Sequence, residues 1–429
     1  MSVSRILSYF VTAILISSLF SSGFVPLVHS QGFQVPVTVA TYGNAWEGEL
    51  VFGLWQPPAN SYLVIMKTNG QLDFLRQSND LSYIIARNVT SDTIMFMGEP
   101  VLGQVSVAPL NPTHFWNYAV NTTVDFPNVT GHHDIVYNPI NNTFLTLRDY
   151  LRTVNGTDYL YDKIVELNSE GNILWSWDTF DYIPLSQADP FNPTAVVNGT
   201  VVPDFTHANS LDWDYKNSII YLNCRHTNTF YKINKTSSNL IWSCGEHGNF
   251  TLLSDNGTIV PSLWYHSHTT RQVEPNVFSM FDNDFDNETN PNNCRSRMIE
   301  VTVNEQNMTA WVNWSWSAPT QYWTPFWGKA DRLPNGDRIG TFGSYTHQFP
   351  QNQPWGFNDT GAVLVEVNPQ GQVVRTYTFQ AGWGVYRIEE MDSFNVIPEF
   401  PGTRVLFIGF AIMSVGIAAT KVVLKKRLE

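Results

Sequence analysis

The sequence is short of charged residues and of cysteine. Charged side chains make up 14% of its 429 residues, whereas an average globular protein has about 25%. Three cysteines are present, without the close Cys-X-X-Cys spacing of a structural zinc site. Lysine and arginine number 24 against 37 acidic residues, for a net charge of −13. This balance argues against a protein that follows the phosphate backbone of a nucleic acid, because no basic stripe is available to neutralise it.

Motifs for bound cofactors are missing as well. The chain has no phosphate-binding loop and no Gly-X-Gly-X-X-Gly turn between a strand and a helix. The acidic stretch 282–288 lacks the glycine and the glutamate that a calcium loop requires. We therefore predict that the protein uses neither a cofactor nor a metal ion.

Aromatic residues, in contrast, are abundant. They make up 14% of the chain, with 15 Trp, 18 Tyr and 27 Phe, so the sequence must fold around a large core. Between residues 31 and 398 no long segment has the 3.6-residue period of a helix, whereas short runs of Val, Ile, Thr, Tyr and Trp recur between Gly, Asn and Pro turns. This pattern is typical of an all-β fold.

Both ends of the chain predict an extracellular protein attached to a membrane. Residues 1–30 combine Arg5 with a long apolar stretch and are predicted to be a signal peptide, with an uncleaved anchor as the alternative. Residues 405–424 are long and apolar enough for a transmembrane helix, and the basic tail 425–429 assigns that end to the cytoplasm. The linker 396–404 contains Pro-Glu-Phe-Pro and resembles the membrane anchors of archaeal surface proteins.

Glycosylation sequons are spread over the middle of the chain and favour a glycoprotein at the cell surface. The thirteen Asn-X-Ser/Thr sequons are at Asn88, Asn121, Asn128, Asn141, Asn155, Asn198, Asn234, Asn249, Asn256, Asn287, Asn307, Asn313 and Asn358. The three cysteines are an odd number, so at least one of them lacks an intramolecular partner. Among the possible disulfides we favour Cys224 with Cys244, because both belong to one group of strands, although the spacing does not fix the pairing.

One β-hairpin unit repeats along the chain. Its five copies cover residues 63–74, 163–175, 230–242, 298–311 and 363–373. An asparagine occupies the same turn position in the last four, at residues 168, 234, 304 and 368, with intervals of 66, 70 and 64 residues. This interval suits one blade of a β-propeller with long loops. Five to seven blades fit the repeat, and a two-sheet sandwich is the alternative.

We assign residues 62–395 to the propeller. The preceding residues 31–61 are then either a short N-terminal β segment or the closing strand of the last blade. 

A second repeated unit lies upstream of the hairpins, and three of its copies begin with histidine. These copies begin at His133, His207 and His268, and a fourth begins at Trp327 without a histidine. Equivalent residues of successive blades lie at one height around the axis, so the three imidazoles are expected to meet at one site. With Arg225, eighteen residues after His207, they would form an anion site. The alternative is a structural role for each imidazole between blades.

These motifs together resemble those of the PAPS-independent arylsulfate sulfotransferases, a family of β-propeller enzymes. The resemblance covers about residues 62–389 and rests on His132-His133-Asp134, His207-Ala-Asn-Ser with Arg225, Trp242-Ser-Cys-Gly245, His268 with Phe281-Asp-Asn283, Arg297, and Tyr386-Arg387. It implies a six-bladed propeller outside the cytoplasm. It also implies a ping-pong transfer of a sulfuryl group from a phenolic sulfate donor to a phenolic acceptor, without a nucleotide cofactor.

The resemblance further implies a role for each motif residue. His268 is expected to be the nucleophile that carries a transient sulfohistidine, with His266, two residues earlier, as the alternative. His207 and Arg225 are expected to bind the sulfate oxygens, and His133 to act as general acid or base. Further candidates for substrate binding are Asn209, His132, His266 and Arg297.

Two other classes of function stay open at this point. An extracellular binding or adhesion module would use the histidines only structurally. A diverged propeller hydrolase would need carboxylates at the axis, where the repeat predicts histidines instead. The expected partners are a small aryl sulfate, a phenolic acceptor and the membrane, with no nucleic acid. The sequence does not determine the physiological substrates or the oligomeric state.

Overall fold

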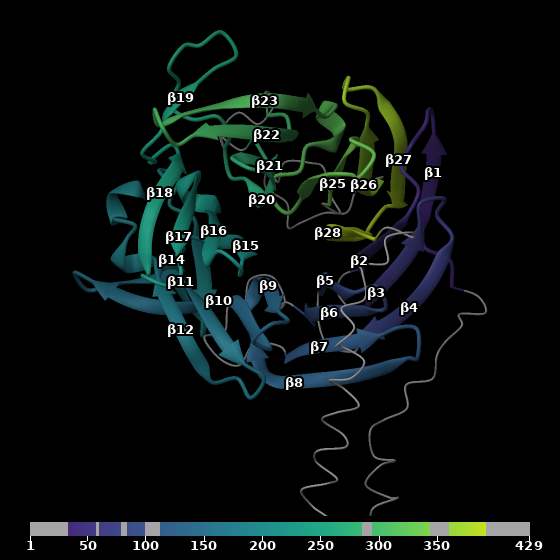
Figure 1. Ribbon diagram of the computed structural model, residues 1–429, viewed down its shortest axis with the longest axis horizontal. Coiled ribbons are helices and arrows are strands. Elements are labelled where there is room, and N and C mark those ends of the chain that lie inside the picture. Colours follow the sequence, from purple (N-terminus) through teal and green to yellow (C-terminus); the bar gives the residue numbers. More distant parts are fainter. Residues whose placement is uncertain are drawn as a thin grey trace, which may run out of the picture. The chain divides into compact units, whose positions relative to one another are not determined.

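A computed structural model describes residues 33–56, 60–78, 84–98, 112–284, 294–343 and 360–391. Their strands form six sheets of four or five strands, which follow one another around a ring in Figure 1. Contacts between inner strands run from β28 to β5, β9, β15, β20 and β24, and then back to β28. The predicted all-β, six-bladed propeller is therefore confirmed. No helix within the described ranges is long and apolar enough to cross a membrane, and the predicted segments 1–30 and 405–424 lie outside these ranges.

The first three blades contain the following strands, from the inner to the outer edge. Blade 1 consists of β28 (Gly384–Met391), β2 (Glu49–Gln56), β3 (Asn60–Lys67) and β4 (Leu72–Ser78). Blade 2 consists of β5 (Ile84–Thr90), β6 (Thr93–Gly98), β7 (Pro112–Asn117) and β8 (Thr122–Thr130). Blade 3 consists of β9 (His132–Asn138), β10 (Thr143–Val154), β11 (Thr157–Asn168) and β12 (Ile173–Asp178).

The remaining blades follow the same plan, and blades 5 and 6 each have a fifth strand at the outer edge. Blade 4 consists of β15 (Ala208–Asp214), β16 (Ile219–Cys224), β17 (Thr229–Asn234) and β18 (Asn239–Gly245). Blade 5 consists of β20 (His268–Glu274), β21 (Val277–Asp282), β22 (Arg297–Asn304), β23 (Thr309–Ser317) and β19 (Thr251–Leu253). Blade 6 consists of β24 (Lys329–Arg332), β25 (Arg338–Phe342), β26 (Thr360–Val367), β27 (Val373–Gln380) and β1 (Val37–Thr41).

Short elements occupy several connections, both between blades and, for η3, within blade 4. A separate hairpin, β13 (Thr194–Val197) with β14 (Thr200–Pro203), lies between blades 3 and 4 in the sequence. The 3-10 helices are η1 (Thr179–Asp181), η2 (Leu185–Gln187), η3 (Arg225–Thr227) and η5 (Thr320–Tyr322). Of these, η3 carries Arg225 directly after the second strand of blade 4.

The two ends of the described chain close the ring twice. The C-terminal strand β28 pairs with β2 as the inner strand of the first blade, and the N-terminal strand β1 pairs with β27 as the outer strand of the last blade. Residues 37–56, which the sequence assigns to a separate β segment or a closing strand, are thus strands of blades 6 and 1. Closure gives every inner strand a neighbouring blade on both sides, so no blade has the uncovered apolar face that the end of an open array would have.

The five predicted hairpins are the outer hairpins of blades 1, 3, 4, 5 and 6. The turn asparagines stabilise these hairpins directly, because the side-chain oxygens of Asn168, Asn234, Asn304 and Asn368 each accept backbone N–H groups two to four residues further on. Asn117 makes the same contact with the N–H of Val120 in blade 2. It is the equivalent residue of blade 2, the one blade whose hairpin the repeat analysis did not identify.

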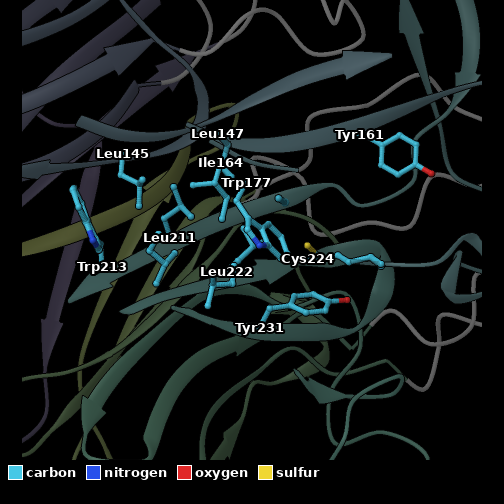
Figure 2. Packing of buried hydrophobic residues seen from close by; sticks show 14 of the residues in the cluster. Leu145, Leu147, Tyr161, Ile164, Trp177, Leu211, Trp213, Leu222, Cys224 and Tyr231 are labelled. Atoms are coloured by element: carbon cyan, nitrogen blue, oxygen red, sulfur yellow. The ribbon is translucent and has the colours of Figure 1, made fainter. Parts of the chain in front are cut away.

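Apolar side chains fill the space between neighbouring blades. Figure 2 shows this packing between blades 3 and 4, where Leu147 and Ile164 lie against Leu211 and Leu222. Each blade presents apolar residues on both faces because both are covered by a neighbour. Burying a side chain of this size contributes about 1.5–3 kcal/mol relative to leaving it exposed.

The favoured Cys224–Cys244 disulfide is wrong. All three cysteines are buried and none forms a disulfide in the described residues. Strand β17 lies between β16, which carries Cys224, and β18, which carries Cys244, so about 10 Å separates the two strands. The two thiols also belong to different apolar clusters. A disulfide needs two Cα atoms within about 7 Å.

A buried carboxylate joins four of the six blades near the axis. Asp134 on β9 accepts hydrogen bonds from Arg87 on β5 at 2.6 and 3.0 Å and from Arg387 on β28 at 2.5 Å. It also accepts the backbone N–H of Leu211 on β15 at 2.9 Å. Burial by itself raises the pKa of this carboxyl group, but the two guanidinium groups outweigh that effect and lower the pKa to about 2.

Every inner strand contributes to the network of charges around Asp134. The cations are Arg87, Arg271, Lys329 and Arg387, and the anions are Asp134, Asp212, Asp331, Glu389 and Glu390. Arg271 contacts Glu389 at 2.5 Å, and Lys329 lies 2.9 Å from Asp331 and 3.0 Å from Glu390. Buried charges persist in this way only when they are paired and hydrogen bonded.

Replacing Asp134 by Asn should lower the free energy of unfolding by about 3–5 kcal/mol, because Arg87 and Arg387 would keep their charges in a buried place without this counter-ion. The matched control is Asp125→Asn, whose carboxylate is 64% exposed beside His114 and should contribute less than about 1 kcal/mol. Urea unfolding followed by tryptophan fluorescence measures both values. Equal losses in the two variants would contradict the central role of Asp134.

Candidate active site

The starts of three neighbouring inner strands bring the predicted histidines together. The ring centres of His133 and His207 are 5.0 Å apart. The ring of Tyr386 on β28 lies 6.2 Å from His133 and also 6.2 Å from His268. Three distant histidines of the sequence therefore gather around one point, as the second repeat predicts.

The backbone around this group is strained. His133, His207 and His266 have positive φ angles of 55°, 46° and 55°, and Trp327 has 68°. A non-glycine residue in this left-handed region costs of order 1 kcal/mol or more, and such residues concentrate at functional sites. The strain at four places near the starts of inner strands supports a functional role for the side chains that these turns present.

Hydrogen bonds fix the tautomer of His268. The amide nitrogen of Asn283 donates to the carbonyls of Thr324 and Trp327 at 2.6 and 2.8 Å, so its oxygen faces His268. That oxygen lies 2.7 Å from Nδ1 of His268 and requires a proton on this nitrogen. Nε2 therefore holds a lone pair, which accepts the N–H of Trp327 over 3.3 Å. The imidazole is neutral and presents a nucleophilic nitrogen.

The protonation of His268 agrees with this geometry. The imidazole is 2% exposed, and burial lowers its pKa well below the usual 6.5, with a further contribution from the positive charge of Arg225. Burial likewise lowers the pKa of His133, assisted by the neighbouring His207 and His132. A buried neutral imidazole beside a guanidinium is suited to attack an anionic group rather than to bind a cation.

Arg225 and His207 both belong to blade 4, where His207 precedes β15 and Arg225 follows β16. The guanidinium Nη2 of Arg225 donates to the carbonyl of Pro325 at 2.9 Å, and its backbone N–H donates to the carbonyl of His207. Nδ1 of His207 is 2.6 Å from a carboxylate oxygen of Asp204. This contact orients the imidazole of His207.

His226 and His266 form a second row behind His207. The ring of His226 lies 4.5 Å from that of His207 and 6.0 Å from that of His266. Nε2 of His266 contacts the buried carboxylate of Asp189 at 2.5 Å. This nitrogen must carry a proton to bind the carboxylate, so it offers no lone pair for attack. The contact favours His268 over His266 as a nucleophile.

Asn209 supports the segment that carries these histidines. Its amide nitrogen donates to the carbonyl of Ser267 at 2.8 Å, and its oxygen accepts from Asn223 at 2.8 Å. Asn223 also donates to the same carbonyl at 2.9 Å. The side chain of Asn209 is fully buried in this network, which fixes the backbone between His266 and His268.

Arg297 lies further along blade 5 and its charge is already paired. Its Nε and Nη2 atoms contact one carboxylate oxygen of Asp282 at 2.8 and 2.5 Å, and Nη2 also donates to the carbonyl of Leu263. Asp282 raises the pKa of Arg297. The structure therefore shows Arg297 within a local ion pair, in contrast with Arg225, whose charge acts on His268.

His132 occupies the position in blade 3 that His268 occupies in blade 5. Each is the first residue of its inner strand, is paired with the second strand, and precedes a two-residue bulge. The first bulge residues, His133 and Thr269, have positive φ angles of 55° and 53°. The assumption that His133 and His268 share one register is therefore wrong. The bulge begins directly after His132. The side chain of His133, the next residue, therefore reaches the site.

Two groups of side chains lie close enough together to consider a metal ion. They are Asp204 with His207 and His226, and His132 with Asp149 and Asp162. The 2.6 Å contact in the first group is a hydrogen bond and is shorter than the roughly 3.3 Å between two ligands of tetrahedral zinc. In the second group two carboxylates face one imidazole nitrogen. We assign both groups as direct contacts between imidazole and carboxylate groups.

Sequence reasoning missed the partners that orient the histidines. These are Asp204, Asp189, Asn283, Asp149 and Asp162. Asp204 stands three residues before His207, and this short spacing is the one local signal of the five. It also missed the carboxylates of the inner strands, of which Asp134, Asp331, Glu389 and Glu390 pair with arginine or lysine.

Aromatic side chains near the site differ in their roles. Trp264 is fully buried within an apolar cluster of blades 4 and 5 and serves packing there. Trp327 borders the histidines, because its ring lies 6.0 Å from Tyr386 and its N–H meets His268. Two surface hollows of about 560 and 450 Å³ are lined by residues of outer strands, such as Val374 and Trp311, and not by the histidines.

Three solved structures resemble the chain at low similarity. TolB from Acinetobacter baumannii is 10% identical with a TM-score of 0.43, over 79% of this chain and 67% of its own. A protein from Lactobacillus plantarum is 8% identical with a TM-score of 0.41, over 81% and 100%. A chain of a nidogen/laminin complex is 8% identical with a TM-score of 0.41, over 79% and 97%. These values are too low to carry a conclusion.

Comparison with protein families gives a direct answer. No curated protein matches the chain. The sequence model of the arylsulfotransferases matches residues 71–387, which include His133, His207, Arg225 and His268. Because this match spans well over half of the chain, the protein belongs to the arylsulfotransferase (ASST) family.

Proposed function

We propose that the protein transfers a sulfuryl group from an aryl sulfate to a phenolic acceptor through a covalent sulfohistidine at His268. Family membership supports arylsulfotransferase-type activity on small aromatic substrates. The observation that carries the finer proposal is the lone pair on Nε2 of His268, which Asn283 fixes in place beside the charge of Arg225.

In the first half-reaction, Nε2 of His268 attacks the sulfur atom of the donor. The nitrogen–sulfur bond forms, the bond between sulfur and the phenolic oxygen breaks, and that oxygen leaves with the electron pair. Arg225 and His207 bind the sulfuryl oxygens, on which charge is distributed during transfer. The contact between His207 and Asp204 keeps the imidazole oriented for this task.

In the second half-reaction, an acceptor phenol takes the place of the released phenol. His133 accepts the acceptor's proton as general base, after having donated a proton to the departing oxygen as general acid. The acceptor oxygen then attacks the sulfur atom and displaces His268. The sequence of events is ping-pong, because one pocket serves donor and acceptor in turn. The rings of Tyr386 and Trp327 are the aromatic surfaces nearest to this chemistry.

We further propose that this chemistry takes place outside the cell, on a domain anchored by the C-terminal span 405–424. The exposed positions of sequon asparagines such as Asn155, Asn198 and Asn256 support this, because a glycosylated residue must lie at the surface. The signal peptide, the anchor and the resemblance to archaeal surface proteins remain predictions from the sequence.

Replacing His268 by Ala should abolish transfer from p-nitrophenyl sulfate to phenol, with a loss of at least about 10³-fold. The rapid first release of p-nitrophenol, which reports sulfation of the enzyme, should vanish as well. Colour release followed by stopped flow measures both. His114→Ala, on the outer part of blade 2, is the control and should retain activity within about twofold. Turnover by the His268→Ala variant at the wild-type rate would overturn the assignment of His268 as the nucleophile.

Replacing Arg225 by Lys should lower kcat/KM about 10²-fold, although the charge is kept, because an ammonium group cannot hold two sulfuryl oxygens with one planar fork. Arg225→Ala should lower it further. Steady-state rates of the two variants give the comparison. Arg148→Lys is the control, since that guanidinium contacts backbone carbonyls of blade 2. Full activity of Arg225→Lys would show that charge alone is needed.

The rate of enzyme sulfation should resist acid. Burial and Arg225 lower the pKa of His268 below 6.5, and the neutral imidazole is the nucleophile, so the reactive form persists at pH values where an ordinary histidine is protonated. With p-nitrophenyl sulfate, whose leaving group needs little protonation, the burst rate should change less than about threefold between about pH 7.5 and pH 6. A tenfold fall per pH unit from about pH 6.5 would indicate an ordinary pKa.

A further inference from the structure

His132 connects the site to two buried carboxylates. Its Nε2 lies 3.3 Å from Asp149 on β10 and 3.2 Å from Asp162 on β11. Its Nδ1 lies 2.9 Å from Nδ1 of His133. The side chain is 4% exposed. Both ring nitrogens of His132 therefore face protein groups, and the mechanism described so far gives this arrangement no task.

The contact between the two imidazoles can exist in two forms. Nε2 of His132 must carry a proton because it faces carboxylates. If His132 is neutral, its Nδ1 is an acceptor, and His133 must donate from Nδ1 and hold a lone pair on Nε2. If His132 is an imidazolium, it donates from Nδ1, and His133 carries its proton on Nε2. The proton between the two rings thus decides whether His133 is a base or an acid.

The surroundings of His132 supply negative charge. Asp162 is buried, yet its pKa is lowered, because the effect of burial is outweighed by hydrogen bonds from His132, Ala208 and Thr206. Burial raises the pKa of Asp149 to about 6, so this carboxyl group is ionised at neutral pH. The other titratable or charged groups that act on Asp149 or His133 come from neighbouring elements and are Asp204, His207, His268 and Arg387.

We propose that Asp149, Asp162 and His132 form a proton relay that supplies His133 during transfer. When the donor's phenolic oxygen leaves, the Nε2 proton of His133 passes to it, and the Nδ1 proton of the His132 imidazolium passes to Nδ1 of His133. Phenol departs and both imidazoles are neutral. The acceptor's proton then enters at Nε2 of His133, and the Nδ1 proton returns to His132. The proton is stored in the protein between the half-reactions.

The proton relay rests on the proposed function and deepens it. Within the relay, His132 is a positioning residue that acts through His133. Its contribution depends on the leaving group. A poorly acidic phenol must be protonated as it departs, whereas p-nitrophenolate leaves without help. A purely structural His132 would affect both donors by the same factor. The dependence of rate on leaving-group acidity therefore separates a relay from a scaffold.

The test compares phenyl sulfate with p-nitrophenyl sulfate as donors for wild type and His132→Gln, with burst rates measured in single turnovers. The variant should increase the ratio of the p-nitrophenyl to the phenyl rate by about 10²-fold, because it removes the proton source but not the nucleophile. Asp149→Asn should change the ratio in the same direction by a smaller factor. In Asp149→Asn, Asp162 still accepts the backbone N–H of Ala208 and the hydroxyl of Thr206. This variant therefore keeps the test possible if His132→Gln fails to fold.

The outcomes separate the relay from the proposed function. If wild type transfers neither donor, the proposed function fails. If wild type transfers both donors, and folded His132→Gln and Asp149→Asn keep the wild-type rate ratio, the relay alone is overturned. Rates that fall by equal factors for both donors also overturn it, since they describe a scaffold. A larger ratio in either folded variant supports the relay. Near-ultraviolet circular dichroism establishes which variants are folded.

Discussion

The carboxylate of Asp134 is the interaction on which both the ring and the site depend. It receives two guanidinium groups and the backbone N–H of Leu211, and these partners belong to three other blades. The next residue towards the N-terminus is His133, whose backbone is held in a left-handed conformation. A strained turn persists only when its surroundings determine it fully. The contacts that close the propeller are therefore also those that hold the backbone of His133 at the candidate site.

The sequence predicts the blades well because their outer hairpins repeat a turn with a local physical cause. An asparagine that accepts backbone N–H groups is visible in one chain without any alignment. The copy at Asn117 in blade 2 escaped notice because Tyr-Ala-Val follows its asparagine, whereas polar, Pro or Gly residues follow the asparagine in the other copies. The pairing of β28 with β2 and of β1 with β27 could not be predicted, since it joins residues more than 300 positions apart.

The main residues of the candidate site could be predicted from the sequence. The residues that hold them in place could not. Repetition reveals His133, His207 and His268 because all three stand at the start of an inner strand. Asn283 and Asp189 come from a strand end and a connection, where position follows no period. A bulge of two residues also changes which side chain reaches the axis, and sequence spacing does not reveal bulges. Orientation of a catalytic group is thus harder to infer than its identity.

The double closure of the ring bears on the order in which the protein is made. Domains fold largely from the N-terminus as the chain leaves the ribosome. Here the first blade lacks its inner strand until residues 384–391 have been synthesised. Arg387 on that strand then reaches Asp134, which was made some 250 residues earlier. A chain released early by the ribosome would leave this carboxylate with half of its guanidinium partners, and the transferase would be assembled only from complete translation products.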